Sequence, residues 1–194
     1  MENLEVEKIQ FNSNTLQEAI FEWIENKQQA LIKFGDISTW DTSLVTNMDA
    51  LFYKLGGFND DISTWDVGNV TSMRYMFYEA YSFNKPLNDW EVFNVKNMGG
   101  MFFNSYSFNQ PLDKWEVNNV ETMQGMFAGA KRFNRDINSW NVSNVKNMKG
   151  MFFDASNFNK PLDNWELNNL VDCTLMFVQA IKFNKKINGE SFDN

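Results

Sequence analysis

The chain has 194 residues, of which 43% are hydrophobic and 16% aromatic, with a formal net charge of −8 and a pI near 4.6. Its length and hydrophobic content suffice for a substantial core, whereas the acidic balance argues against nucleic acid as a partner, because phosphate backbones require clustered Lys and Arg. The sequence contains no His, which excludes Ser-His and Cys-His nucleophile pairs and His-based metal sites. One cysteine cannot form a disulfide framework within the chain.

The amino-terminal 34 residues predict a cap. Residues 5–11, EVEKIQF, suggest a short edge strand, and the segment 13–15, SNT, offers helix N-caps with Gln17 and Glu18 as capping-box partners. Apolar residues then recur at helical spacing, which predicts an amphipathic helix at about 14–26, with a continuation to 33 as the alternative. We expect Trp23 to pack on the first repeat, because the end of a repeat stack exposes its core.

A 25-residue unit recurs from residue 35 to 182. The Trp column comprises Trp40, Trp65, Trp90, Trp115, Trp140 and Trp165. A Phe-Asn pair begins at positions 58, 83, 108, 133, 158 and 183. A fixed period of this length is typical of a stacked repeat array. We therefore predict a cap at 1–34, six repeats at 35–182, and a partial repeat with a carboxy-terminal cap at 183–194, where Glu190 replaces the expected Trp.

Each repeat predicts a strand followed by a short helix. In the segment 90–92, WEV, apolar and acidic residues alternate as in a strand, with Trp90 inward. From Asn94, a favourable N-cap, apolar residues fall three or four positions apart as on one helix face. The prediction is an α/β repeat solenoid, a right-handed coil of short parallel strands and helical crossovers. The glycines at 100, 125 and 150 would let neighbouring helices approach closely.

Two columns predict structural roles. We expect the Trp column to be buried, because each indole alternates with an acidic residue and shares its face with Val or Leu. The Asn residues of the Phe-Asn pairs form a second column, whose side chains can satisfy backbone groups of adjacent repeats at a bend. Its members are Asn59, Asn84, Asn109, Asn134, Asn159 and Asn184.

Repeats such as FNKPLNDWEVFNVKNMGGMFFNS resemble the 25-residue repeats of the BspA-like leucine-rich-repeat family, which includes mycoplasma surface lipoproteins. The resemblance covers roughly residues 14–188. It implies a leucine-rich-repeat-like solenoid without catalytic residues, often displayed on cell surfaces and associated with adhesion or protein interaction. The sequence shows neither a signal peptide nor an 18-residue apolar run. We therefore expect no membrane insertion and, by default, a cytoplasmic location.

An acidic column is the first candidate site. It consists of Asp41, Asp66, Glu91, Glu116 and Glu166, and Asn141 interrupts it. The column could be a solvated face, a docking stripe for a basic partner, or a weak Ca²⁺ site at Asp66, Glu91 and Glu116, since Ca²⁺ takes hard oxygen ligands. A hydrolase that uses Glu91 or Glu116 is the least favoured hypothesis.

Surface aromatic residues are the second candidate site. Phe93 breaks an otherwise polar column, and four further rings directly follow a buried Phe: Tyr53, Tyr78, Phe103 and Phe153. An aromatic patch on a repeat surface indicates recognition. We therefore predict a non-catalytic protein-interaction or scaffolding protein, with no cofactor, as a monomer or an end-to-end oligomer. A glycan-binding module that uses surface aromatic residues is the alternative.

Overall fold

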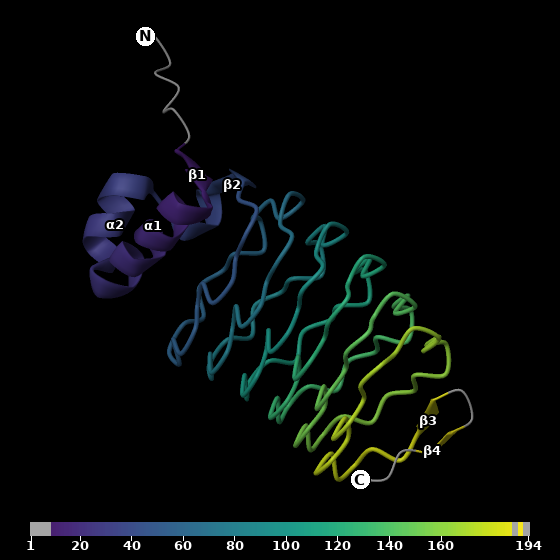
Figure 1. Cartoon of the computed structure of the whole chain (residues 1–194). Helices are drawn as coiled ribbons and strands as arrows, with labels where there is room; N and C mark the ends of the chain where they lie inside the picture. Colours follow the sequence, from purple (N-terminus) through teal and green to yellow (C-terminus); the bar gives the residue numbers. More distant parts are fainter. Residues whose placement is uncertain (1–8, 188–189, 192–194) are drawn as a thin grey trace.

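The computed structural model describes residues 9–187 and 190–191. Figure 1 shows two helices at one end, followed by successive turns of chain, hereafter rungs, stacked side by side to the carboxy-terminal end. The predicted repeat architecture is confirmed. Within the described residues the rungs contain few regular elements: the 3₁₀ helix η1 at Ile37–Thr39 and the strand β2 at Asp41–Leu44 belong to the first rung, and the later rungs are built from turns.

The amino-terminal cap consists of helices α1 (Ser13–Glu25) and α2 (Lys27–Phe34). The predicted helix is confirmed, but the predicted caps were wrong by a few residues. Asn12 is the N-cap of α1, and its side chain accepts the amides of Asn14 and Thr15, while the Thr15 hydroxyl accepts the Asn12 amide. A separate helix replaces the expected continuation because Asn26 leaves helical geometry, with φ −147° and ψ 80°, and caps α2.

The cap closes the first rung as predicted. Strand β1 (Gln10–Asn12) pairs in parallel with β2, while residues 5–8 of the expected edge strand lie outside the described part of the chain. Trp23 of α1 lies edge-on to Trp40, with ring centroids 5.6 Å apart. The Trp23 Nε1 donates to an Oδ of Asp60 at 2.8 Å, so the buried indole keeps a hydrogen bond.

The predicted helical crossovers were wrong. A first set of amides donates to carbonyl oxygens 24 residues later, in the next rung, at 2.7–2.9 Å: those of Met48, Ala50, Phe52 and Lys54. The amides between them close β-turns, as when Leu51 donates to the Met48 carbonyl. An α-helix needs every amide to reach the fourth preceding carbonyl. Because half of these amides bond to the neighbouring rung, a ladder of turns forms in place of a helix.

Left-handed backbone conformations maintain this ladder. Two columns four positions apart adopt φ values of 54–68° in every rung, one containing Gly100 and the other Asn104. Positive φ at the third residue of a turn is the geometry of a type II turn and interrupts a right-handed helix. The glycines of the first column were thus wrongly assigned to helix packing, since they occupy left-handed turn positions.

The predicted strand around residue 91 is also replaced by turns, because Trp90 donates its amide to the Leu87 carbonyl at 3.1 Å. The predicted alternation survives, with Trp90 and Val92 buried and Glu91 exposed. Parallel pairing between rungs is limited to single bridges. These bridges connect Asn47, Ser72, Asn97, Thr122, Asn147 and Asp172 in succession.

Side chains form continuous ladders through the stack. The six Trp of the repeat column are at most 3% exposed, which confirms their predicted burial. From Trp65 to Trp165, each Nε1 donates to a carbonyl oxygen 28 residues earlier at 2.8–3.2 Å. The predicted Asn59–Asn184 ladder is confirmed, because each Oδ1 accepts the amide of the next Asn at 2.9–3.3 Å.

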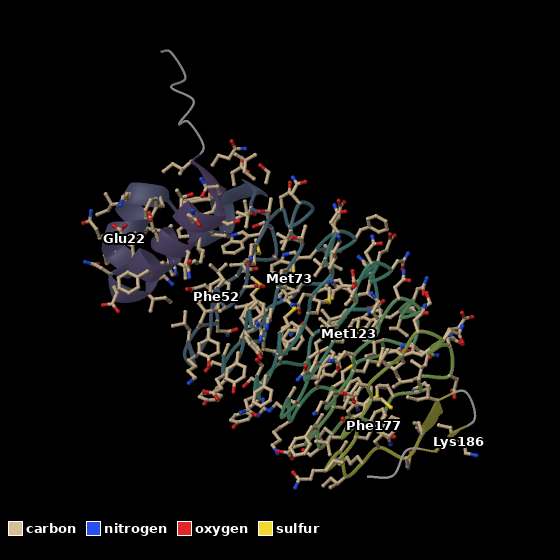
Figure 2. The ribbon with its side chains drawn as sticks, viewed as in Figure 1. Glu22, Phe52, Met73, Met123, Phe177 and Lys186 are labelled. Carbon is tan, nitrogen blue, oxygen red and sulfur yellow. The ribbon has the colours of Figure 1, made fainter. Side chains whose placement is uncertain are left out.

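A second Asn column, predicted to cap helices, instead forms another ladder between rungs. Its Nδ2 groups donate to carbonyls 26 residues earlier at 2.7–2.8 Å: those of Asn69, Asn94, Asn119, Asn144 and Asn169. Figure 2 shows Phe52, Met73, Met123 and Phe177 distributed along the stack. In the Phe52–Phe177 column, successive rings stack with centroids 5.3–5.7 Å apart.

At the carboxy-terminal end, β3 (Lys186–Ile187) pairs antiparallel with β4 (Glu190–Ser191). The proposed capping role of the Glu190 side chain lies outside the described residues. Among the helices that the structure describes, none is long and apolar enough to cross a membrane.

Candidate binding groove

A groove of about 620 Å³ runs along one side of the stack across rungs two to six. The turn ladder positions it, because successive rungs place equivalent residues side by side. Its floor follows the first left-handed column, and its aromatic wall follows the column three positions later in each rung.

Three consecutive rungs contribute glycine to the floor, and the floor is open over the middle of this run. Gly100, Gly125 and Gly150 lie between Tyr75 at one end and Leu175 at the other, all in one column. Over Gly100 the ring of Tyr75 fills the space, since a Cβ there would lie 2.4 Å from two ring carbons. A Cβ at Gly125 would approach Phe103 only to 3.7 Å, so the middle of the floor is less crowded.

A ladder of aromatic rings forms one wall. Tyr53 stacks on Tyr78 at 4.8 Å, and Tyr78 stacks on Phe103 at 4.6 Å, measured between ring centroids. The next position in the column is Ala128, only 3% exposed at the bottom of the groove, and the following one is Phe153. The ring ladder therefore lacks one ring between Phe103 and Phe153, and we call this position the slot.

The opposite rim is polar and carries positive charge. Asn97, Thr122 and Gln124 line it, together with Arg74 and Lys149. The guanidinium of Arg74 lies 4.5 Å from the centroid of the Tyr75 ring and donates to its Oη at 3.2 Å. No Asp or Glu is among the described residues that line the groove. In a chain of net charge −8, this groove is therefore a locally cationic surface.

Within the aromatic wall, the pKa of the Tyr78 phenol departs from its ordinary value. Its partial burial raises the pKa, and the nearby carboxylate of Glu79 adds to the effect. The phenol therefore stays neutral well above physiological pH, so Tyr78 offers a hydrogen-bond donor beside its ring.

The structure divides the predicted aromatic and acidic residues between two places. Tyr78, Phe103 and Phe153 all line the groove. Phe93, 48% exposed, lies with Glu91 and Glu116 at a second, smaller hollow of about 300 Å³. Four further candidates line neither hollow: Asp41, Tyr53, Asp66 and Glu166.

The aspartates of the acidic column have local roles in turns. The carboxylate of Asp66 accepts the Gly68 amide at 2.9 Å, and that of Asp41 accepts the Ser43 amide at 3.0 Å. Asn141 forms the same contact to Ser143, which explains why an amide can interrupt the column. Within residues 9–187, no group of three acidic or cysteine side chains lies close enough to hold a metal ion, so the arrangement that the calcium hypothesis requires is not found.

Sequence reasoning missed Arg74, Tyr75 and Lys149 as groove residues. Two signals could have found them. One is the column that reads Tyr, Gly, Gly, Gly, Leu from residue 75 to 175, and the other is Ala128 in a column otherwise rich in Tyr and Phe. At both places a small residue stands where other rungs carry a large side chain, which leaves a hollow in the surface.

A family model described as "Mycoplasma protein of unknown function, DUF285" matches the sequence twice, at residues 18–130 and 112–194. These matches together span most of the chain. No curated protein and no solved structure matches it.

Proposed function

Because the chain belongs to the DUF285 family, whose description names no activity, we propose its function from its surface: it is a non-catalytic protein-interaction module that binds a partner in the groove. The observation that carries this proposal is the groove of about 620 Å³, with stacked aromatic rings on one wall and a cationic polar rim on the other. Concave sites with apolar walls and a few convergent polar groups are the usual form of binding sites.

The groove is built to remain open. Its floor is backbone whose amides bond the next rung, as Gly125 does to the Lys149 carbonyl at 2.9 Å and Gly150 to the Thr174 carbonyl at 2.8 Å. The wall rings support one another by stacking. A rigid site loses little conformational entropy when it binds, and Tyr is enriched among the residues that dominate interface energies.

The chemistry of the lining favours binding over catalysis. Acid-base and nucleophilic mechanisms need titratable or nucleophilic groups that act near neutral pH. The described lining offers aromatic, amide and hydroxyl groups with Arg74 and Lys149, and the raised pKa of Tyr78 keeps its phenol protonated near neutral pH.

For the architecture, we propose a right-handed solenoid related to the BspA-like leucine-rich repeats, in which turns replace the crossover helices. The 25-residue unit and the chain of single parallel bridges from Asn47 to Asp172 support this assignment. The lateral groove would then be the recognition surface of the solenoid.

A second candidate function is glycan binding at the smaller hollow. There the exposed Phe93 ring lies with Glu91 and Glu116, and the same hollow includes Asn88 and Asp89. An aromatic face can pack on a sugar ring, and carboxylate and amide oxygens can accept its hydroxyl protons.

Parallel screens test the two candidates. The full chain is panned against phage-displayed random 12-residue peptides and applied to an array of neutral oligosaccharides. Substitution Ala128→Phe fills the slot with the ring that the neighbouring column positions carry, and Val178→Phe adds a ring in the same column outside the groove. We expect enriched peptides whose binding is lost with Ala128→Phe and kept with Val178→Phe. Failure to enrich peptides, or binding indifferent to Ala128→Phe, would contradict the proposal.

A further inference from the structure

We propose that the partner segment is an extended acidic peptide that inserts one planar apolar side chain into the slot and presents carboxylates to Arg74 and Lys149. This inference rests on the proposed function and specifies its ligand.

The slot has the dimensions of one aromatic ring. Rungs repeat about every 4.8 Å, the usual spacing of paired extended chains, and Tyr53, Tyr78 and Phe103 stack at 4.8 and 4.6 Å. Phe103 and Phe153 are two rungs apart, so their rings are separated by about 10 Å. A ring placed midway would lie about 5 Å from each neighbour, within the range of favourable aromatic stacking. Ala128 carries no ring at this position and lies 3% exposed at the bottom of the groove, so an inserted ring would pack on its methyl group.

The two cations match an extended chain that runs along the stack. Arg74 and Lys149 belong to rungs three apart, a separation of about 14 Å at the same spacing. In an extended peptide, residues i−2 and i+2 point to the same side as residue i and lie about 13 Å apart. A ring at position i and carboxylates at i−2 and i+2 therefore bring all three groups to the groove at once, within the reach of the long cationic side chains.

Charge selects an acidic ligand. Within residues 9–187 neither Arg74 nor Lys149 forms a salt bridge, while other lysines do, such as Lys114 with Asp89 at 2.7 Å. Arg74 is held against Tyr75 with its guanidinium near the groove. The described lining thus offers two cations and no carboxylate, which favours a ligand that carries carboxylates.

Defined peptides test the ligand. The probe is acetyl-Asp-Ser-Phe-Ser-Asp-amide, titrated into the ¹⁵N-labelled full chain while amide chemical shifts are recorded. We expect the largest shifts at Gly125 and Gly150. Replacing the probe's Phe with Ala should weaken binding about 10- to 100-fold, the loss expected for a buried ring. Replacing both Asp with Asn should weaken it about 2- to 20-fold, the range for two exposed ion pairs, and replacing both with Lys should abolish it.

Protein variants locate the contacts. The double substitution Arg74→Gln with Lys149→Gln should reduce affinity for the Asp probe about 2- to 20-fold and leave the Asn probe unchanged. The matched control Lys114→Gln, a lysine outside the groove, should change neither. Ala128→Phe should abolish binding of both probes, with a spectrum that remains dispersed.

The outcomes separate this inference from the function on which it rests. If library peptides bind in a manner sensitive to Ala128→Phe but the Asp and Asn probes bind equally, the acidic ligand is wrong and protein recognition stands. If no peptide binds and neutral oligosaccharides shift the Gly125 amide, both fail. Shifts confined to residues outside the groove would also overturn the inference.

Discussion

The interior columns and the groove columns of the same rungs behave in opposite ways. Inside the stack one residue type repeats: Trp or Phe occupies its column in every rung, the rings of the Phe52–Phe177 column stack on one another, and Trp115 stacks on Trp140. Along the groove the columns change from rung to rung, from Tyr75 through three glycines to Leu175. Regularity thus builds the stack, and departures from regularity build the surface that can recognise something.

The largest expected effect is on the interior. Substitution Trp115→Ala should lower the free energy of unfolding by about 3–5 kcal/mol, since it removes a buried indole and leaves a cavity. It also deletes the hydrogen bond from Nε1 to the Leu87 carbonyl at 2.8 Å. Urea unfolding followed by circular dichroism measures the loss. The exposed Phe93 is the control, and Phe93→Ala should cost less than about 1 kcal/mol. Similar losses for both would remove the contrast between interior and surface.

Two glycines of the groove floor should respond differently to the same change. Both have φ +61°, so an alanine at either position costs about 1–2 kcal/mol in backbone strain. Gly100→Ala should cost about 1–3 kcal/mol more, because its Cβ would lie 2.4 Å from the Tyr75 ring. Thermal unfolding of both variants gives the difference. Adding Tyr75→Ala to Gly100→Ala should remove the excess, and an undiminished excess would refute the steric explanation.

Breaking the Asn59–Asn184 ladder should lower the free energy of unfolding by an intermediate amount. Asn109→Ala should cost about 1–3 kcal/mol, because the half-buried acceptor for the Asn134 amide, 3.0 Å away, is lost. Asn184→Ala is the matched control at the end of the ladder. Among the described residues the ladder uses only its backbone amide, which the substitution keeps, so a smaller loss is expected. Equal unfolding free energies for wild type and Asn109→Ala would show that the ladder contributes nothing.

The smallest expected effect is on the loss of folding stability at low pH. Hydrogen bonds from the Ser38 hydroxyl and amide lower the pKa of Asp36, and the hydroxyl and amide of Thr174 do the same for Asp172. A carboxyl with a lowered folded pKa contributes stability that is complete above the unfolded value, about 4, and is lost as the pH falls through the folded value. The variant Asp36→Asn with Asp172→Asn should therefore lose less stability than wild type between pH 5 and pH 2, by urea unfolding. Parallel losses would contradict the assignment.

The sequence was sufficient to predict the 25-residue period and the buried Trp column, because both depend on apolar spacing that every rung repeats. The cap helix was predictable from its own helical spacing of apolar residues. It was misleading for Asn94 to Ser105, since apolar residues three and four apart fit a helix and also fit a series of turns that point the same residues inward. Only the neighbouring rung decides between them, by accepting the amides of residues such as Gly100. The aromatic half of the groove was predictable from Tyr78 and Phe103, while Arg74 and Lys149 were not, because nothing local marks them as facing a common hollow.

The bonds between rungs run along the axis of the stack, from alternate amides of the turn ladder to carbonyls one rung away. Tension applied to the two ends therefore loads these bonds in series, and the structure should come apart one rung at a time. Each release frees 25 residues, which extend to about 85 Å in place of the 4.8 Å that they occupied in the stack. Under force, this molecule would lengthen in uniform steps.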